Sequence, residues 1–175
     1  MQLPSVLPDE SLHSRICRSI SLCGYTKQQY LKVLCGSSKV TIHPFIALGV
    51  NVIAKTLNED PNNLLIEQSI NPIFAYFLPK YEKRILNAET PSQKMLRVCQ
   101  LQAFREKEVL SVKYCPLCAK EDLKYYGVAY WHCSHQIPGI EVCYKHKVWL
   151  LHQRPPTRNH IEHGFLPNPA INTRE

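Results

Sequence analysis

The sequence of 175 residues lacks several features that would define its class at once. No apolar run approaches the roughly 18 residues of a membrane-spanning helix, so we expect no membrane association. The first ten residues carry proline and acidic residues in place of a basic segment and an apolar core, which excludes a secretory signal and predicts a cytoplasmic protein. Internal repeats, low-complexity runs and a basic tail are also missing.

The sequence also lacks the common catalytic signatures. It has no glycine-rich phosphate loop and no serine or cysteine triad pattern. A zinc deaminase needs His-x-Glu ahead of Pro-Cys-x-x-Cys, whereas His160-Ile161-Glu162 follows the cysteine pairs of this chain. A two-metal nuclease needs clustered carboxylates, and Glu121-Asp122 is a lone pair. These absences predict a binding protein and not an enzyme.

Cysteine, histidine and positive charge are abundant by contrast. The chain has eight Cys and eight His, and its formal charge is +7. A net positive charge favours an acidic partner, of which nucleic acid is the commonest, but the charge is spread along the chain and supports this only weakly. Disulfides would be expected in a secreted protein, so without an export signal we expect reduced thiols, some of them metal ligands.

The spacing of apolar and capping residues predicts a helical domain over residues 1–110. Thr26 and Gln29 form a capping box, and Gly36 ends the helix that follows it. The helix over 26–34 and the one over 44–57 are candidates for a helix-turn-helix. The expected helices cover about residues 9–23, 26–34, 44–57, 60–66, 71–78 and 91–108. Four cysteines on their apolar faces are expected to be small core residues: Cys17, Cys23, Cys35 and Cys99.

The strongest motif is a pair of ligand turns in residues 111–152. Cys115-Pro-Leu-Cys118 is followed, after residues 119–142, by Cys143-Tyr-Lys-His146. Two ligands with two residues between them fit a tight turn, and two such turns complete a tetrahedron around one ion. Three thiolates and an imidazole fill all four positions, so these residues predict one structural zinc ion with no place for an activated water.

Other readings of this segment remain open. Disulfides or buried free thiols are one alternative, and three residues inside the loop, His132, Cys133 and His135, could be ligands in place of the predicted set. Residues 120–126 are expected to form a short helix that ends at Gly127. After residue 152 periodicity disappears, which predicts an irregular tail or linker over 153–175. The expected fold is therefore mainly α, with a small Cys3His module and a tail.

At these residues the chain resembles the TniQ/TnsD family, the target-selection proteins of bacterial transposons. The resemblance rests on Tyr114-Cys115-Pro116-x-Cys118, Asp122, Gly127, Tyr130-Trp131, His135-Gln136-x-Pro138-Gly139, Cys143-x-x-His146 and Leu150, with weaker matches at Pro8-Asp9-Glu10-Ser11, Ser14-Arg15 and Gly36-Ser-Ser-Lys39-Val40. It covers roughly residues 4–152. The chain departs from the family pattern at Cys133, where a basic residue is frequent, and at Lys147, where a glycine often follows the last ligand.

The resemblance implies a function as well as a fold. Such proteins have an N-terminal helix-turn-helix domain, a Cys3His zinc finger and a further helical region that contacts DNA. They mark an insertion site in the bacterial cytoplasm by binding a fixed DNA sequence or by docking on an RNA-guided CRISPR effector complex. They then recruit an AAA+ ATPase regulator of the TnsC type, and they are adaptors and not enzymes. A generic zinc-containing DNA-binding transcription factor or interaction module is the alternative, because it shares every feature except the resemblance.

Candidate contact residues follow from these expectations. Hydroxyl and cationic side chains reach phosphate oxygens. The DNA candidates are Arg15, Arg18, Lys32, Ser37, Ser38 and Lys39. Tyr and Trp dominate the centres of protein interfaces, which marks aromatic and basic residues near the expected zinc site for partner binding. The partner candidates are Tyr126, Trp131, Tyr144 and Lys145.

Overall fold

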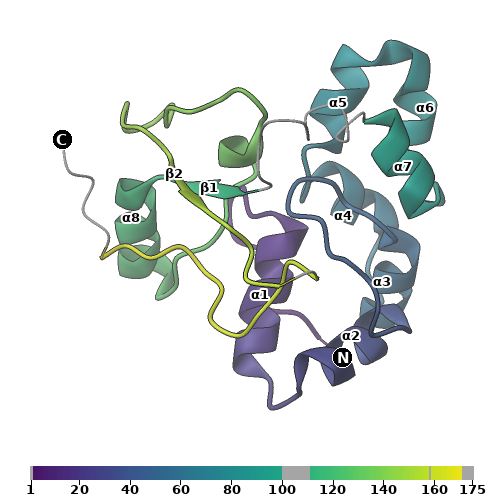
Figure 1. The fold of residues 1–175 in the computed structure, drawn as a ribbon, viewed down its shortest axis with the longest axis horizontal. Helices are drawn as coiled ribbons and strands as arrows, with labels where there is room; N and C mark the ends of the chain where they lie inside the picture. The colour runs from purple at the N-terminus through teal and green to yellow at the C-terminus, as the bar shows by residue number, and fades with distance from the viewer. Residues whose placement is uncertain (1, 100–110, 158, 171–175) are drawn as a thin grey trace.

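The computed structural model describes residues 2–99, 111–157 and 159–170, which fold around a central N-terminal helix (Figure 1). The elements in chain order are α1 (Leu12–Leu22), α2 (Lys27–Cys35), α3 (Val50–Leu57), α4 (Pro61–Ile66), α5 (Asn71–Phe77), η1 (Pro79–Tyr81), α6 (Glu82–Ile85), α7 (Ser92–Val98), β1 (Val112–Tyr114), α8 (Pro116–Tyr126), η3 (Ser134–Gln136) and β2 (Leu151–Gln153). The mainly helical fold class is confirmed. No helix of the described residues is long and apolar enough to span a bilayer.

Local capping chemistry sets the ends of several helices. Thr26 accepts a hydrogen bond from the backbone N–H of Gln29 while the Gln29 side chain accepts one from Thr26, so the expected capping box is present. Gly36 ends α2 with φ of 73°, a left-handed conformation that glycine adopts at no steric cost. Asp60 caps α4 ahead of Pro61, again as the sequence predicts.

Two expected helices differ from the structure. Residues 44–49 are not helical, because His43 Nδ1 accepts hydrogen bonds from the backbone N–H groups of Phe45 and Ile46, and Gly49 turns left-handed (φ 62°) before α3 begins. Helix α7 ends at Val98, and the expected continuation over 100–108 lies outside the described residues. Helices α2 and α3 pack together, but residues 36–49 join them, a longer connection than the roughly 3–4 residues of a usual helix-turn-helix. The helix-turn-helix stays a prediction.

One hydrophobic core runs from the helices into the segment with the ligand turns. It contains residues of α1 such as Ile16 together with Tyr114, Trp131, Ile161 and Phe165. Side chains from both sides of the expected domain boundary near residue 111 therefore pack in one core. The segment after residue 153 has no regular structure in its described residues, as predicted, but Ile161 and Phe165 bury their apolar side chains in the same core as α1. The tail passes across α1 in Figure 1.

A second core holds α5, α6 and α7 together at the far end of the helices from α8 (Figure 1). Ile85, Met95 and Cys99 are buried in it, and Cys133 joins it from the loop after Trp131. On the other side of α1, β1 pairs antiparallel with β2, Tyr114 opposite Leu151. The chain passes from β1 directly into α8, and β2 follows the second ligand turn.

Candidate metal centre

The four predicted ligands meet at one point beside the start of α8. Cys115 is the N-cap residue of α8 and Cys118 lies in its first turn, so both sulfurs project from the same helix end. The second turn is closed by two backbone hydrogen bonds, from Cys143 N–H to Val148 C=O and from Lys147 N–H to Cys143 C=O, both 2.9 Å. The donor atoms of Cys115, Cys118, Cys143 and His146 all lie within 4.8 Å of one another. This group can hold a metal ion.

The distances between the donor atoms match a tetrahedral site. Bonds of about 2.3 Å to sulfur and about 2.0 Å to nitrogen place two sulfurs about 3.8 Å apart and a sulfur and a nitrogen about 3.5 Å apart. The sulfurs of Cys118 and Cys143 are 3.8 Å apart. His146 Nδ1 lies 3.3 Å from the Cys118 sulfur and 3.4 Å from that of Cys115. These distances suit a single ion held by the four groups, with Nδ1 as the imidazole donor.

The surroundings favour a thiolate at Cys115 and fix the imidazole, whereas the hydrogen bond to Cys115, burial and neighbouring thiolate charge raise the pKa of Cys118. A hydrogen bond from the Cys118 thiol, opposed by burial and aided by backbone amides, lowers the pKa of Cys115 to about 5. The second ring nitrogen of His146 lies 3.3 Å from a carboxylate oxygen of Glu121, which fixes the ring with Nδ1 toward the sulfurs. Sequence reasoning took Glu121 for a plain surface residue. Its position three residues after Cys118 on the same helix face was the available signal.

The alternative ligands lie elsewhere. His135 Nε2 is 3.9 Å from the Cys118 sulfur, outside the group of four. Burial lowers the pKa of His135 to about 4, so the ring is neutral. Cys133 is buried in the α5–α7 core. The predicted quartet is thus the set that converges among the described residues.

His132, another of the alternative ligands, forms ion pairs with two aspartates. Its ring lies 2.9 Å from Asp122 and 3.6 Å from Asp9, stacks on Tyr130 and contacts the neutral His135 ring. Burial lowers the pKa of His132, but the hydrogen bonds and charges of the two aspartates outweigh it and raise the pKa to about 9. The protonated ring therefore bridges α8 and the segment before α1.

The residue after the last ligand has an unusual backbone. Lys147 has φ of 58°, in the left-handed region that glycine adopts without strain. The resemblance identified this position as one where a glycine often stands. A lysine at this position therefore holds its backbone in a conformation that is disfavoured for residues other than glycine.

Two of the DNA candidates are corrected by the structure. Arg15 is 6% exposed, and its guanidinium donates two 2.8 Å hydrogen bonds to the Glu59 carboxylate. Arg18 is 8% exposed and binds Glu10, itself 1% exposed, through two 2.7 Å hydrogen bonds. Both arginines hold α1 in place and are not available to phosphate. The remaining candidates form an exposed group at the end of α2: Lys32, Ser37, Ser38 and Lys39.

The partner candidates also divide. Trp131 is 0% exposed and packs on Tyr114 and Phe165, so its assignment to a binding surface is wrong. Tyr126 and Tyr144 are exposed, as is Lys145, which pairs with Glu121. Trp149 was not among the partner candidates. It is 71% exposed, whereas Leu150 and Val148 pack on the ligands.

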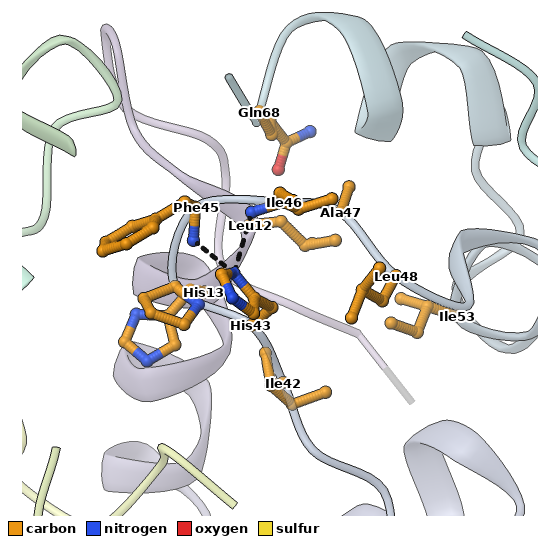
Figure 2. Close-up of a pocket in the computed structure, with 11 residues that line it drawn as sticks. Leu12, His13, Ile42, His43, Phe45, Ile46, Ala47, Leu48, Ile53 and Gln68 are labelled. Carbon is orange, nitrogen blue, oxygen red and sulfur yellow. Dashed lines mark hydrogen bonds between the residues drawn. The ribbon is translucent and has the colours of Figure 1, made fainter. Parts of the chain in front are cut away.

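A cavity beside α1 offers little room for a ligand. It lies between α1 and the loop 42–48, where the His43 ring receives the two backbone hydrogen bonds (Figure 2). Its volume is about 10 Å³, the space of roughly one water molecule. His13, whose pKa burial lowers to about 4, lines it and donates a 2.7 Å hydrogen bond from Nε2 to the His160 carbonyl oxygen. This cavity is part of the core.

Comparisons with known proteins identify the family of this chain. The TniQ family model matches residues 2–150, which include the helices and all four ligands. The chain belongs to the TniQ family. It is also 25% identical over 160 residues to the transposon Tn7 transposition protein TnsD of Escherichia coli. That match covers 86% of this chain and 31% of the relative, so this TniQ chain spans about a third of the relative's length.

Proposed function

We propose that the Cys3His group binds one structural zinc ion. Thiolate and imidazole donors in a tetrahedral arrangement suit Zn²⁺, and 3.8 Å between two sulfurs is the separation such an ion needs. The four protein donors leave no open position, so the ion stabilises the fold and does not activate water. Zinc would fix the turn at residues 143–146 against α8. The exposed side chains of this turn would then have a rigid base.

Metal analysis of two matched cysteine variants tests this site. We expect about one zinc per chain in the wild type and less than about a tenth in Cys143→Ser, because three remaining donors bind far more weakly. Cys35→Ser is the control, since Cys35 lies at the end of α2 outside the group of four. Full zinc occupancy in Cys143→Ser, or no zinc in the wild type, would refute the assignment.

We infer that the protein is a target-selection adaptor for DNA transposition and not an enzyme. The single observation that carries this is the TniQ family match over residues 2–150. The name of the relative, a transposition protein, supports it. In this function the chain binds target DNA, or a guide complex such as a CRISPR effector, and recruits a TnsC-type AAA+ ATPase. A generic zinc-containing DNA-binding module would share the fold but recruit no such ATPase.

The exposed aromatic residues around the second ligand turn are the proposed ATPase surface. Tyr144 is 67% exposed and Trp149 is 71% exposed, on either side of the metal-binding turn. Val142 and Trp149 form an antiparallel β-bridge that closes this turn. Lys145 is exposed between them, and Tyr126 ends the neighbouring helix α8. Large aromatic side chains on a rigid support lose little entropy on binding and dominate interface energetics.

Recruitment of a TnsC-type ATPase by the purified chain tests the function. With nucleotide and DNA present, the double variant Tyr144→Ala/Trp149→Ala should bind such an ATPase at least tenfold more weakly while retaining its zinc, since a central aromatic residue contributes about 2 kcal/mol or more. Tyr76→Ala is the matched control, because Tyr76 is 80% exposed on α5 and remote from the metal. No recruitment by the wild type would favour the generic DNA-binding module, and equal loss in both variants would exclude this surface.

A further inference from the structure

A basic cleft lies between α6 and α7, away from every contact residue considered so far. Tyr81, Arg84, Lys94, Arg97 and Val98 line it, and its volume is about 360 Å³. Arg84 comes from α6, whereas Lys94 and Arg97 are one turn apart on α7. The three cationic side chains that line the cleft therefore come from two separate helices. Sequence reasoning missed the cleft because only the packing of α6 on α7 brings them together.

The helices that carry this cleft are anchored in the α5–α7 core, whereas its cationic side chains are unpaired within the described part of the chain. Ile85 and Met95, the residues after Arg84 and Lys94, are 0% and 2% exposed in the α5–α7 core. The side chains of Arg84, Lys94 and Arg97 are exposed, and within residues 2–99, 111–157 and 159–170 they form no ion pair or hydrogen bond. Arg15 and Arg18, by comparison, are paired with the partly exposed Glu59 and the buried Glu10.

The local charge balance favours an anionic ligand. Residues 71–98 contain five Lys and Arg (Lys80, Lys83, Arg84, Lys94 and Arg97) against two Glu (Glu82 and Glu89). Guanidinium groups bind phosphate oxygens through paired hydrogen bonds, and a lysine adds a mobile point charge. Tyr81 places a phenol hydroxyl at the same cleft as a further donor.

We propose that this cleft binds the phosphate backbone of duplex DNA, independently of base sequence; the proposal rests on the DNA-binding part of the proposed function. Cations that project from packed helices, and that pair with no carboxylate of the described residues, provide the kind of contact that positions a protein on DNA. Helices α6 and α7, which carry the cleft, lie on the opposite side of α1 from α8 (Figure 1). DNA held there leaves the exposed aromatic residues of the metal-binding turn free for a protein partner.

DNA binding measured over a range of salt concentrations, with variants that remove two positive charges, tests the cleft. The double variant Arg84→Gln/Arg97→Gln is compared with Lys120→Gln/Lys124→Gln, which removes the same charge from exposed positions on α8. The probe is a fluorescent 30-base-pair duplex of arbitrary sequence, titrated between about 50 and 200 mM salt. Loss of two phosphate contacts should flatten the slope of log K against log salt by about 1.8, since each contributes about 0.9. We expect at least tenfold weaker binding at low salt for the cleft variant and less than threefold for the control.

Each other outcome contradicts the cleft assignment in a distinguishable way. Equal loss in both variants would indicate net charge alone, and a wild-type chain that binds no duplex at low salt would exclude the cleft outright. Weaker ATPase binding in the cleft variant without DNA would indicate an acidic protein partner instead. ATPase recruitment by the wild type, measured separately, decides the proposed function in all of these cases. Unchanged thermal unfolding of both variants excludes misfolding as the cause of any loss.

Discussion

Substitution of Trp131 by alanine should destabilise both halves of the molecule together. Its backbone N–H donates a 2.9 Å hydrogen bond to Ser14 Oγ, and its carbonyl group accepts one of 3.1 Å from Ser11 N–H. The indole N–H donates to the Phe165 carbonyl group at 3.2 Å, and the ring packs on Tyr114. Trp131 therefore connects the segment with the ligand turns to α1 and to the tail.

The expected loss can be estimated from these contacts. A fully buried Trp replaced by Ala costs about 3–5 kcal/mol through lost transfer energy and the cavity left behind. The indole hydrogen bond adds about 1 kcal/mol, less if water reaches the orphaned carbonyl group. With a slope of about 2 kcal/mol per molar urea, a loss of about 4 kcal/mol lowers the unfolding midpoint by about 2 M. This is a large part of the 5–15 kcal/mol that stabilises a typical domain.

Urea unfolding followed by two probes measures this effect. Far-UV circular dichroism reports the helices, and Trp149 fluorescence reports the metal module, because Trp149 is the other tryptophan of the chain. Both transitions should move together to lower urea in Trp131→Ala. Trp149→Ala is the control and should shift the circular dichroism transition by less than about 0.5 kcal/mol, since that side chain is 71% exposed. A helical transition that stays in place while the Trp149 transition moves would refute the shared core.

Three further predictions concern single positions. Lys147→Gly should raise the free energy of unfolding by about 0.5–1 kcal/mol, measured by urea titration, because glycine removes the left-handed strain at φ of 58°; an unchanged or lower value would contradict it. The protonated His132, with its pKa raised to about 9 mainly by Asp122 against the effect of burial, should contribute about 3 kcal/mol that is fully present below pH 6.5 and lost as pH rises to about 9. His132→Gln should flatten this decline, and equal slopes in both proteins would exclude the ion pair as its source. Thr26→Ala should lower thermal stability by about 1 kcal/mol through loss of the α2 cap, whereas Thr26→Ser should retain it.

The sequence by itself determined the features that depend on neighbouring residues. The capping box at Thr26, the left-handed stop at Gly36 and the two ligand turns at Cys115 and Cys143 need only short-range chemistry, so spacing was enough to predict them. The spacing of apolar residues also predicted a helix where a local hydrogen bond prevents it. His43 binds the N–H groups that follow it, and residues 44–49 stay non-helical although their apolar pattern predicts a helix.

Only the tertiary structure decided which charged and aromatic side chains remain exposed. Arg15 is neutralised by Glu59, a residue of the segment between α3 and α4, and no local pattern links the two positions. Trp131 and Trp149 have the same chemistry, yet one is buried against Phe165 and the other is exposed. Burial depends on which distant segments pack together. The sequence therefore determined which four residues could hold a metal ion, whereas the fold determined the surfaces around them.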